Sequence, residues 1–157
     1  MPAQITLAES PLDIAHVAEL FREYAAWLAF PLDFQNFDEE LTTLPGKYAS
    51  PTGRLLLARC DGLPAGCGAF RPLDPKVCEM KRVFVRPEFR GHQLGYAMIV
   101  RLISEAREAG YEFIRLDTIP GKMPDANRIY RTLGFYEIPP YYQGNPHADA
   151  CYLEVRL

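Results

Sequence analysis

The sequence predicts one α/β domain built on a mixed, mostly antiparallel sheet of about six to seven strands with helices on both faces. Three observations predict this fold. The chain has 157 residues, which suits a single domain over residues 1–157. Short alternating apolar segments follow one another as a meander in the first half, whereas helical segments separate the strands in the second half. Two strands flank the longest later helix, so at least one strand pair should be parallel.

Composition excludes several classes of protein. Hydrophobic residues make up 48% and charged residues 24% of the chain, which is typical of a globular protein and excludes disorder. The net charge of −3 argues against a nucleic-acid partner. Apolar runs fall far short of the roughly 20 residues that cross a bilayer, and the N-terminal residues lack a signal-peptide pattern. We therefore expect a cytoplasmic protein that binds neither nucleic acid nor a membrane.

The cysteines and histidines are scattered. Cys60, Cys67, Cys78 and Cys151 have no C-x-x-C spacing, and the three histidines form no ligand set with them. In a reducing compartment such cysteines are best interpreted as small hydrophobic residues of strands, with a disulfide or metal pair as the alternative. The sequence predicts no metal site.

The first elements of the chain are a strand and a long helix. Residues 4–8 alternate weakly and predict a strand. Ser10 then offers an N-cap, Pro11 takes the first helical position, and an acid follows at the third. Apolar residues at three- and four-residue spacing extend this helix to about residue 29. A short second helix is expected at residues 37–41.

Three strands of a meander follow, and later strands alternate with helices. Asp61 and Gly62 form the hairpin turn between the first two strands of the meander. Glycine after the long helix, at Gly110, is typical of a helix end. The expected strands are residues 54–60, 65–70, 77–85, 113–117, 135–138 and 151–157, and the expected helices are residues 95–109 and 125–133.

The strand at residues 77–85 contains a conflict. Simple alternation would place Glu79 and Lys81 on the same face as two later valines, which mixes charge with a core. A β-bulge between the charged residues and the valines would resolve it. The pattern therefore predicts a face that mixes charge with a core unless the strand bulges at this point.

The junction between this strand and the long helix reads VFVRPEFRGHQLGYA over residues 83–97. A turn with two glycines that opens onto a helix presents unpaired backbone N–H groups at the positive end of the helix dipole, which suits a phosphate. A plain strand-to-helix turn that needs glycine for its backbone is the alternative. The G-x-G-x-x-G and P-loop patterns are absent.

This junction resembles the acyl-CoA loop of the GCN5-related N-acetyltransferase (GNAT) superfamily. The family pattern [RQ]-x-x-G-x-[GA] follows a strand that ends V-x-P, and residues 85–87 and 90–95 here read VRP and RGHQLG. Gln93 stands where the pattern has its first glycine. Family members also carry a tyrosine shortly before Leu-Gly-Phe, and Tyr130 precedes that tripeptide at residues 133–135.

The resemblance implies acetyl-CoA as co-substrate. Strand residues would bind its pantetheine amides, the loop would hold its pyrophosphate, and two residues of the later helix would reach the pantetheine arm or the phosphates. A solvated helix charge is an equal alternative for Arg131. The residues expected to bind acetyl-CoA are Val83, Phe84, Val85, Arg90, Gly91, His92, Gln93, Leu94, Gly95, Tyr96, Ala97, Asn127 and Arg131.

Two catalytic residues are expected. An amine with a pKa of about 10 is mostly protonated at neutral pH, so the reaction needs a base, directly or through water. Glu79 lies on the strand before the loop, where similar enzymes often place such a base. The alternatives are a solvated strand acid or an ion-pair partner of Lys81 or Arg82. Tyr130 could protonate the leaving thiolate, with simple aromatic packing as the alternative.

The expected function is acetyl transfer from acetyl-CoA to a primary amine of a small molecule or peptide, by direct attack in a ternary complex. A non-catalytic acyl-CoA sensor and a nucleotide-binding module are the alternatives. Residues 30–48 and 139–147 are candidates for the border of the acceptor pocket, although the aromatic residues of the first segment, which include Phe30 and Phe34, could instead attach that loop to the core. A homodimer is possible.

Overall fold

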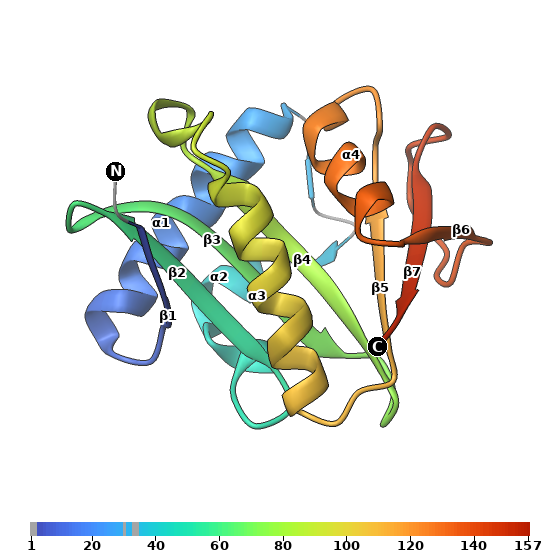
Figure 1. Cartoon of the computed structure of the whole chain (residues 1–157), viewed down its shortest axis with the longest axis horizontal. Helices are drawn as coiled ribbons and strands as arrows, with labels where there is room; N and C mark the ends of the chain where they lie inside the picture. Colours follow the sequence, from blue (N-terminus) through green and yellow to red (C-terminus); the bar gives the residue numbers. More distant parts are fainter. Residues whose placement is uncertain (1–2, 30, 33–34) are drawn as a thin grey trace.

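A seven-stranded sheet runs through the molecule in the order β1-β2-β3-β4-β5-β7-β6 (Figure 1). The computed structural model describes residues 3–29, 31–32 and 35–157. Every neighbouring pair of strands is antiparallel except β4 and β5, so the predicted mixed, mostly antiparallel sheet is confirmed. The strands are β1 (Ala3–Leu7), β2 (Arg54–Cys60), β3 (Leu63–Pro72), β4 (Val77–Val85), β5 (Phe113–Thr118), β6 (Tyr136–Ile138) and β7 (Cys151–Arg156).

Helices cover both faces of this sheet (Figure 1). The first two helices lie on one face, and the two later helices lie on the other, as two separate clusters of buried residues also indicate. The predicted boundaries agree with the observed ones to within two residues, and β3 extends two residues further at each end than predicted. The helices are α1 (Pro11–Leu28), α2 (Phe37–Thr43), α3 (Leu94–Glu108) and α4 (Pro124–Thr132), with short 3-10 helices η2 (Gly46–Tyr48) and η3 (Pro87–Phe89).

Helix α1 begins as the sequence predicts. The backbone N–H of Asp13 donates a hydrogen bond of 3.1 Å to the Ser10 hydroxyl, which satisfies one of the unpaired donors of the first turn. The helix ends where Ala29 adopts a left-handed conformation with φ of 60°. The buried face of α1 packs on the sheet through Val17, Leu20, Phe21, Tyr24 and Leu28.

The bulge that resolves the conflict in β4 is present. Lys81 pairs with Ala69 of β3, but Phe84 pairs with Cys67, so three steps along β4 face two steps along β3. Arg82 lies between these pairs and has a positive φ of 63°. Because the bulge shifts the alternation by one residue, Phe84 joins the cluster under α1, and the flanking valines face α3 and α4.

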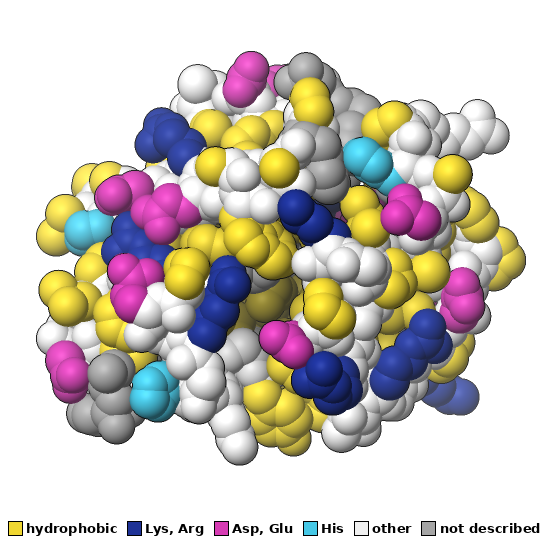
Figure 2. Space-filling model, turned by 90° about the horizontal axis from the view of Figure 1, so that it is seen from above, with side chains coloured by type: hydrophobic (Ala, Val, Ile, Leu, Met, Phe, Trp, Pro, Cys, Tyr) yellow, Lys and Arg dark blue, Asp and Glu magenta, His cyan; other side chains and the backbone are white. Residues whose placement is uncertain are grey.

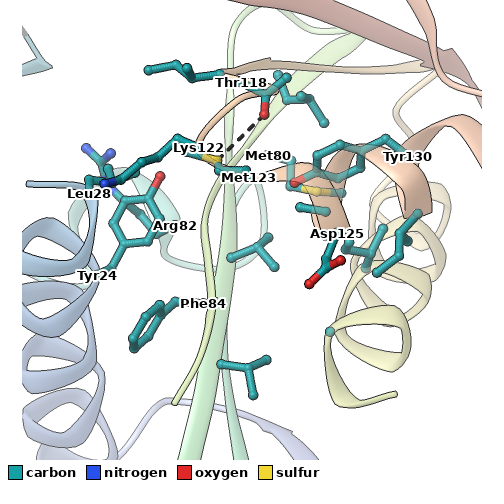
Figure 3. A pocket seen from close by; sticks show the side chains of 18 of the residues that line it. Tyr24, Leu28, Met80, Arg82, Phe84, Thr118, Lys122, Met123, Asp125 and Tyr130 are labelled. Atoms are coloured by element: carbon teal, nitrogen blue, oxygen red, sulfur yellow. Dashed lines mark hydrogen bonds between the residues drawn. The ribbon is translucent and has the colours of Figure 1, made fainter. Parts of the chain in front are cut away.

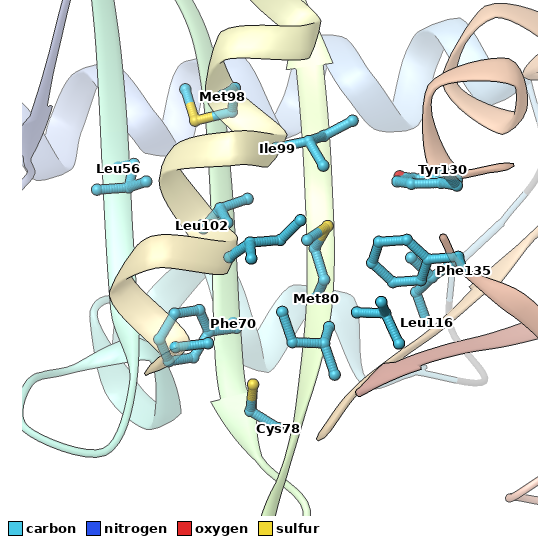
Figure 4. Packing of buried hydrophobic residues seen from close by; sticks show 14 of the residues in the cluster. Leu56, Phe70, Cys78, Met80, Met98, Ile99, Leu102, Leu116, Tyr130 and Phe135 are labelled. Carbon is cyan, nitrogen blue, oxygen red and sulfur yellow. The ribbon is translucent and has the colours of Figure 1, made fainter. Parts of the chain in front are cut away.

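Helix α3 packs across the centre of the sheet (Figure 4). Met98, Ile99 and Leu102 of α3 are buried over Met80 of β4 and Leu56 of β2. Each such side chain contributes about 1.5–3 kcal/mol when it leaves water. This packing holds the N-terminal end of α3 beside the C-terminal end of β4.

The parallel strands β4 and β5 pair over only three residues. Val77, Cys78 and Glu79 face residues 113–115, and beyond this point no pairing between the two strands is found in the described part of the chain. The strands diverge toward their C-terminal ends, which leaves one edge of β4 without a strand partner (Figure 1). The gap lies at the start of α3. Within the described ranges, no helix is both long enough and apolar enough to cross a membrane.

Candidate active site

A cavity of about 630 Å³ occupies the gap between β4 and β5. Its wall includes Tyr24 and Leu28 of α1 on one face of the sheet and Ile129 and Tyr130 of α4 on the other, so the cavity reaches both faces through the gap. Figure 2 shows the hollow from above, with hydrophobic side chains on its floor and basic side chains at its rim. Two molecules could therefore enter from opposite faces and meet between the strands.

The loop before α3 forms one side of this cavity. Gly91 and Gln93 both have positive φ angles, of 87° and 59°, and α3 begins immediately afterwards. The first backbone hydrogen bond of the helix runs from the N–H of Ala97 to the carbonyl of Gln93, at 3.0 Å. The N–H groups of residues 94–96 therefore have no acceptor within the helix and are available to an anion.

Arg90 fixes this loop to the end of β4. Its Nε donates a hydrogen bond of 2.8 Å to the carbonyl of Val85. The guanidinium also lies 5.3 Å from the ring centre of Trp27 and 5.7 Å from that of Phe84. These contacts hold the loop in place before any ligand binds, which lowers the ordering cost of binding.

Neither the packing nor the backbone conformation at residue 95 requires a glycine. A Cβ atom at this position would approach nothing more closely than Val85 at 3.9 Å and Ile129 at 4.0 Å, and its φ is not positive. The missing side chain opens the first turn of α3 toward the cavity. The loop therefore fits a diphosphate held by main-chain N–H groups, as the family resemblance implies.

Tyr130 projects from α4 into the cavity (Figure 3). Its side chain is 6% exposed, and its ring packs against Phe135 at a centroid distance of 5.4 Å. The hydroxyl has no hydrogen-bond partner among the residues that the structure describes. Burial raises the pKa of Tyr130, so its hydroxyl stays protonated and can donate.

Glu79 lies in a buried ionic cluster beside the cavity and is not part of its wall. The residue is 1% exposed. Its carboxylate accepts hydrogen bonds of 2.6 Å from the Tyr141 hydroxyl and 2.9 Å from Arg71, and it lies 3.8 Å from the Lys81 ammonium. Burial alone would raise its pKa, but the charge of Lys81 and the bonds from Tyr141 and Arg71 lower it below the ordinary value. Glu79 is thus held ionised.

Lys81 and Arg82 both line the cavity at the bulge. The Arg82 guanidinium donates to both carboxylate oxygens of Glu40, at 2.8 and 3.0 Å, and to Gln35 at 2.8 Å. Lys81 donates no hydrogen bond to any residue in the described ranges, although its side chain is only 4% exposed. Burial, with the charge of Arg82, lowers the pKa of Lys81.

Most of the residues expected to bind acetyl-CoA lie together in the cavity wall. Of all the predicted site residues, catalytic and cofactor-binding, five lie outside the cavity wall. The Asn127 amide is instead buried and donates to the Thr118 hydroxyl and the Met123 carbonyl, both at 2.8 Å, which joins α4 to β5. The predicted residues in the wall are Val83, Phe84, Val85, Arg90, Gly91, Gln93, Leu94, Gly95, Tyr96 and Tyr130, and those outside it are Glu79, His92, Ala97, Asn127 and Arg131.

Sequence reasoning missed the part of the wall that α1, β5 and the segment after β5 supply. Tyr24 and Leu28 belong to the apolar stripe of α1, whose spacing predicts only a core face, and Trp27 follows Tyr24 at three-residue spacing. An aromatic residue beside a core stripe is the signal that could have found it. Asn145 confirms that the segment 139–147 borders the cavity, whereas Phe30 and Phe34 lie outside the described residues.

The cysteines are hydrophobic residues of strands, as predicted. Cys60, Cys67 and Cys78 are buried and free. Burial raises the pKa of the Cys67 thiol, and it raises that of Cys78 to about 12. Neither thiol is therefore a ready nucleophile. The described residues contain no group of three or more side chains that could hold a metal ion.

Comparisons with known proteins agree with this geometry. A model of the acetyltransferase (GNAT) family matches residues 16–135. An uncharacterised N-acetyltransferase of Schizosaccharomyces pombe is 37% identical over 155 residues, which are 98% of this chain and 94% of that protein. An IAA acetyltransferase of Azospirillum brasilense is 35% identical over 162 residues and all of both chains. The crystal structure of the PaiA N-acetyltransferase of Thermoplasma acidophilum in complex with coenzyme A shares the fold, with a TM-score of 0.76, 15% identity and full coverage of both chains.

Proposed function

This chain belongs to the acetyltransferase (GNAT) family, and we propose that it transfers an acetyl group from acetyl-CoA to a primary amine by direct attack in a ternary complex. The observation that carries the proposal is the cavity that joins both faces of the sheet between β4 and β5. A donor on one face and an acceptor on the other would be brought together there, which lowers the barrier by fixing their orientation. The relatives that are acetyltransferases, and the related structure with coenzyme A, support the choice of donor.

The unpaired edge of β4 and the loop before α3 would hold the donor. Backbone groups of Val83 and Val85 lie beyond the last pairing with β5, so they can bind the amides of an extended ligand arm. The free N–H groups of residues 94–96 would hold its pyrophosphate. When bound, acetyl-CoA supplies an activated thioester carbonyl and a thiolate leaving group.

Glu79 is retained as the proposed general base, with water as the carrier of the proton. Its lowered pKa keeps it a carboxylate in mildly acidic solution. Because Glu79 is not in the cavity wall, a water molecule would pass the proton from the amine to it. In the reaction the amine nitrogen bonds to the carbonyl carbon, the carbon–sulfur bond breaks, and the amine loses one proton.

Tyr130 is the proposed proton donor to the leaving thiolate. We expect Tyr130→Phe to lower kcat about 10²-fold because the ring stays in place and only the hydroxyl is lost. The Kd of acetyl-CoA, measured by calorimetry, should stay the same. Tyr111→Phe is the matched control, since Tyr111 is also buried but donates to the carbonyl of Thr52 away from the cavity. Wild-type turnover in Tyr130→Phe would remove this residue from the mechanism.

The activity itself is tested by the release of free thiol. The purified protein is incubated with acetyl-CoA and a panel of primary amines, and mass spectrometry identifies the acetylated product. We expect thiol release that depends on both the protein and an amine. Tight binding of acetyl-CoA with no turnover on any amine would instead favour a non-catalytic acyl-CoA sensor. Stronger thermal stabilisation by ATP than by coenzyme A would favour a nucleotide-binding module.

A further inference from the structure

Lys81 lines the cavity, and its ammonium has no hydrogen-bond acceptor among the described residues. Its nearest carboxylate is that of Glu79, at 3.8 Å, and that carboxylate already accepts bonds from Tyr141 and Arg71. A buried cation with three donors and no acceptor is costly, and a ligand that supplies an anion would remove the cost.

The other charged groups around Lys81 already have hydrogen-bond partners. On the α2 side, the Glu40 carboxylate accepts hydrogen bonds from Nε and Nη2 of Arg82. On β5, Asp117 accepts a hydrogen bond from the Tyr142 hydroxyl, and Arg115 is paired with Glu154 of β7 at 2.8 Å. Within the described part of the chain, Lys81 therefore shares its ion-pair partner, Glu79, with Arg71.

The cavity wall contains more basic than acidic side chains, although Glu40 and Glu79 are paired with two of the basic ones. Its basic wall residues are Lys81, Arg82, Arg90 and Lys122, and its acidic ones are Asp117 and Asp125. Lys122 is exposed and extends toward the side of the cavity that α1 forms (Figure 3). Arg90 and Lys122, which form no ion pair among the described residues, favour an acceptor that carries a negative charge in addition to its ammonium group.

The wall next to Lys81 is apolar on the α1 face. Tyr24, Leu28 and Leu32 line the cavity there, and all three are buried in the same cluster. Because Lys81 pairs with Ala69 of this cluster across the sheet, Lys81 lies on the same face as the hydrophobic residues. The two features together suit a small molecule with an anionic end and an apolar body.

We propose that the acceptor is a small amino acid-like amine, whose carboxylate binds the Lys81 ammonium and whose apolar side chain lies against Tyr24, Leu28 and Leu32. This inference rests on the proposed acetyl transfer and names its substrate class. A carboxylate beside the amine would place the nitrogen near the gap between β4 and β5, where the strand edge of β4 is free.

The test compares three acceptors that differ only in the anionic group. Phenylalanine, its carboxamide and phenethylamine are offered with acetyl-CoA, and initial rates of thiol release are measured at a fixed pH. We expect kcat/KM for phenylalanine to exceed the values for the other two by about 10- to 100-fold, as for a lost charge-assisted hydrogen bond. The carboxamide retains the size of phenylalanine, and its amine is the weaker base, so a preference for phenylalanine cannot come from a more available amine.

Variants of Lys81 then locate the effect. In Lys81→Met we expect the KM of phenylalanine to rise about 10- to 100-fold while the KM of phenethylamine changes little. Any effect of the lost charge on Glu79 should lower kcat equally with both acceptors, so the ratio of the two KM values reports the carboxylate site. Lys81→Arg should restore most of the preference because it keeps the charge. Calorimetry with acetyl-CoA on each variant checks that the site remains folded.

The outcomes separate this inference from the proposed function. Acetylation of phenethylamine as efficient as that of phenylalanine would overturn the carboxylate site but leave acetyl transfer standing. An equal loss of kcat with both acceptors in Lys81→Met, with the KM of phenylalanine unchanged, would mean that Lys81 acts only on catalysis, through Glu79 or as a proton acceptor, and would also overturn it. Failure of every amine in the panel to release thiol would contradict the proposed function itself.

Discussion

Glu79 and Lys81 are neighbours on one strand, yet their surroundings give them different chemistry. Glu79 receives hydrogen bonds on both of its oxygens, whereas Lys81 has a charge partner at 3.8 Å and no hydrogen bond in the described structure. The pKa of each group is lowered, which keeps Glu79 charged but makes the ammonium of Lys81 less stable. The Glu79 carboxylate, which hydrogen bonds keep ionised, is suited to accept a proton through water. The Lys81 ammonium, which has no hydrogen-bond acceptor in the described structure, is suited to bind an anion.

The base role of Glu79 predicts a characteristic pH profile. Glu79→Gln should lower kcat most at low pH, by about 10²-fold, because the wild-type carboxylate stays ionised there while the amine is protonated. The difference should shrink as the pH approaches the amine pKa of about 10, where the free amine needs no base. Steady-state rates from about pH 6 to pH 9 measure this profile.

Asp117→Asn is the matched variant for this experiment. Asp117 is a carboxylate in the cavity wall, and one of its oxygens accepts a hydrogen bond from Tyr142. We expect a smaller loss in this variant, without the steep dependence on pH. The reverse result, with a flat ratio in Glu79→Gln and a steep one in Asp117→Asn, would transfer the base role to Asp117.

At the scale of elements, the site depends on the bulge in β4 and on the start of α3. The sequence indicated either a bulge or a mixed face, because two charged residues stood on what would otherwise be the face of the valines, and the register at Lys81 and Phe84 confirms the bulge. The loop before α3 was predictable from its glycines and its motif. The contribution of α1 was not, because Tyr24 and Leu28 serve both the core and the cavity, and spacing alone cannot separate these roles.

Gln93 adopts the conformation for which the family pattern has a glycine. Its φ of 59° costs a side-chain-bearing residue about 1–2 kcal/mol, but the side chain itself is exposed. We expect Gln93→Gly to leave the free energy of unfolding within about 0.5 kcal/mol of wild type, since the relieved strain offsets the greater freedom of glycine in the unfolded chain. The Kd of acetyl-CoA should be equal to or lower than that of wild type in calorimetry.

Gly91→Ala provides the contrast to that variant. Gly91 has open space around its missing Cβ, so the cost of alanine comes from its φ of 87° alone. This substitution should weaken acetyl-CoA binding, whereas Gln93→Gly should not. A Kd that rises fivefold or more, about 1 kcal/mol, in Gln93→Gly would mean that the glutamine side chain contacts the coenzyme.

At the scale of the whole molecule, the gap between β4 and β5 that forms the site also divides the sheet into two parts. Strands β1 to β4 form one continuous antiparallel unit. Three parallel residue pairs connect β4 of this unit to β5, and β5 in turn pairs with β7. At the end of α3 away from the site, Glu105 connects this unit to the helix. It accepts hydrogen bonds of 2.9 Å from Arg54 of β2 and 2.8 Å from Arg101, and Arg101 also donates to the carbonyl of Ile5 in β1.

Glu105 should therefore contribute stability that depends on pH. Burial alone would raise its pKa, but hydrogen bonds from Arg101 and Arg54 lower it, so the folded state binds a proton less readily than the unfolded chain, in which the pKa is about 4.3. The stabilisation is fully present above that pH and is lost as the pH falls through the lower folded-state value.

Glu105→Gln should lower the free energy of unfolding by about 1–3 kcal/mol at neutral pH and by much less near pH 3. Urea unfolding at both pH values measures this, with Glu108→Gln as the control because Glu108 is exposed on the same helix. An equal loss in Glu105→Gln at both pH values would show that the side chain stabilises the helix by packing and not by charge.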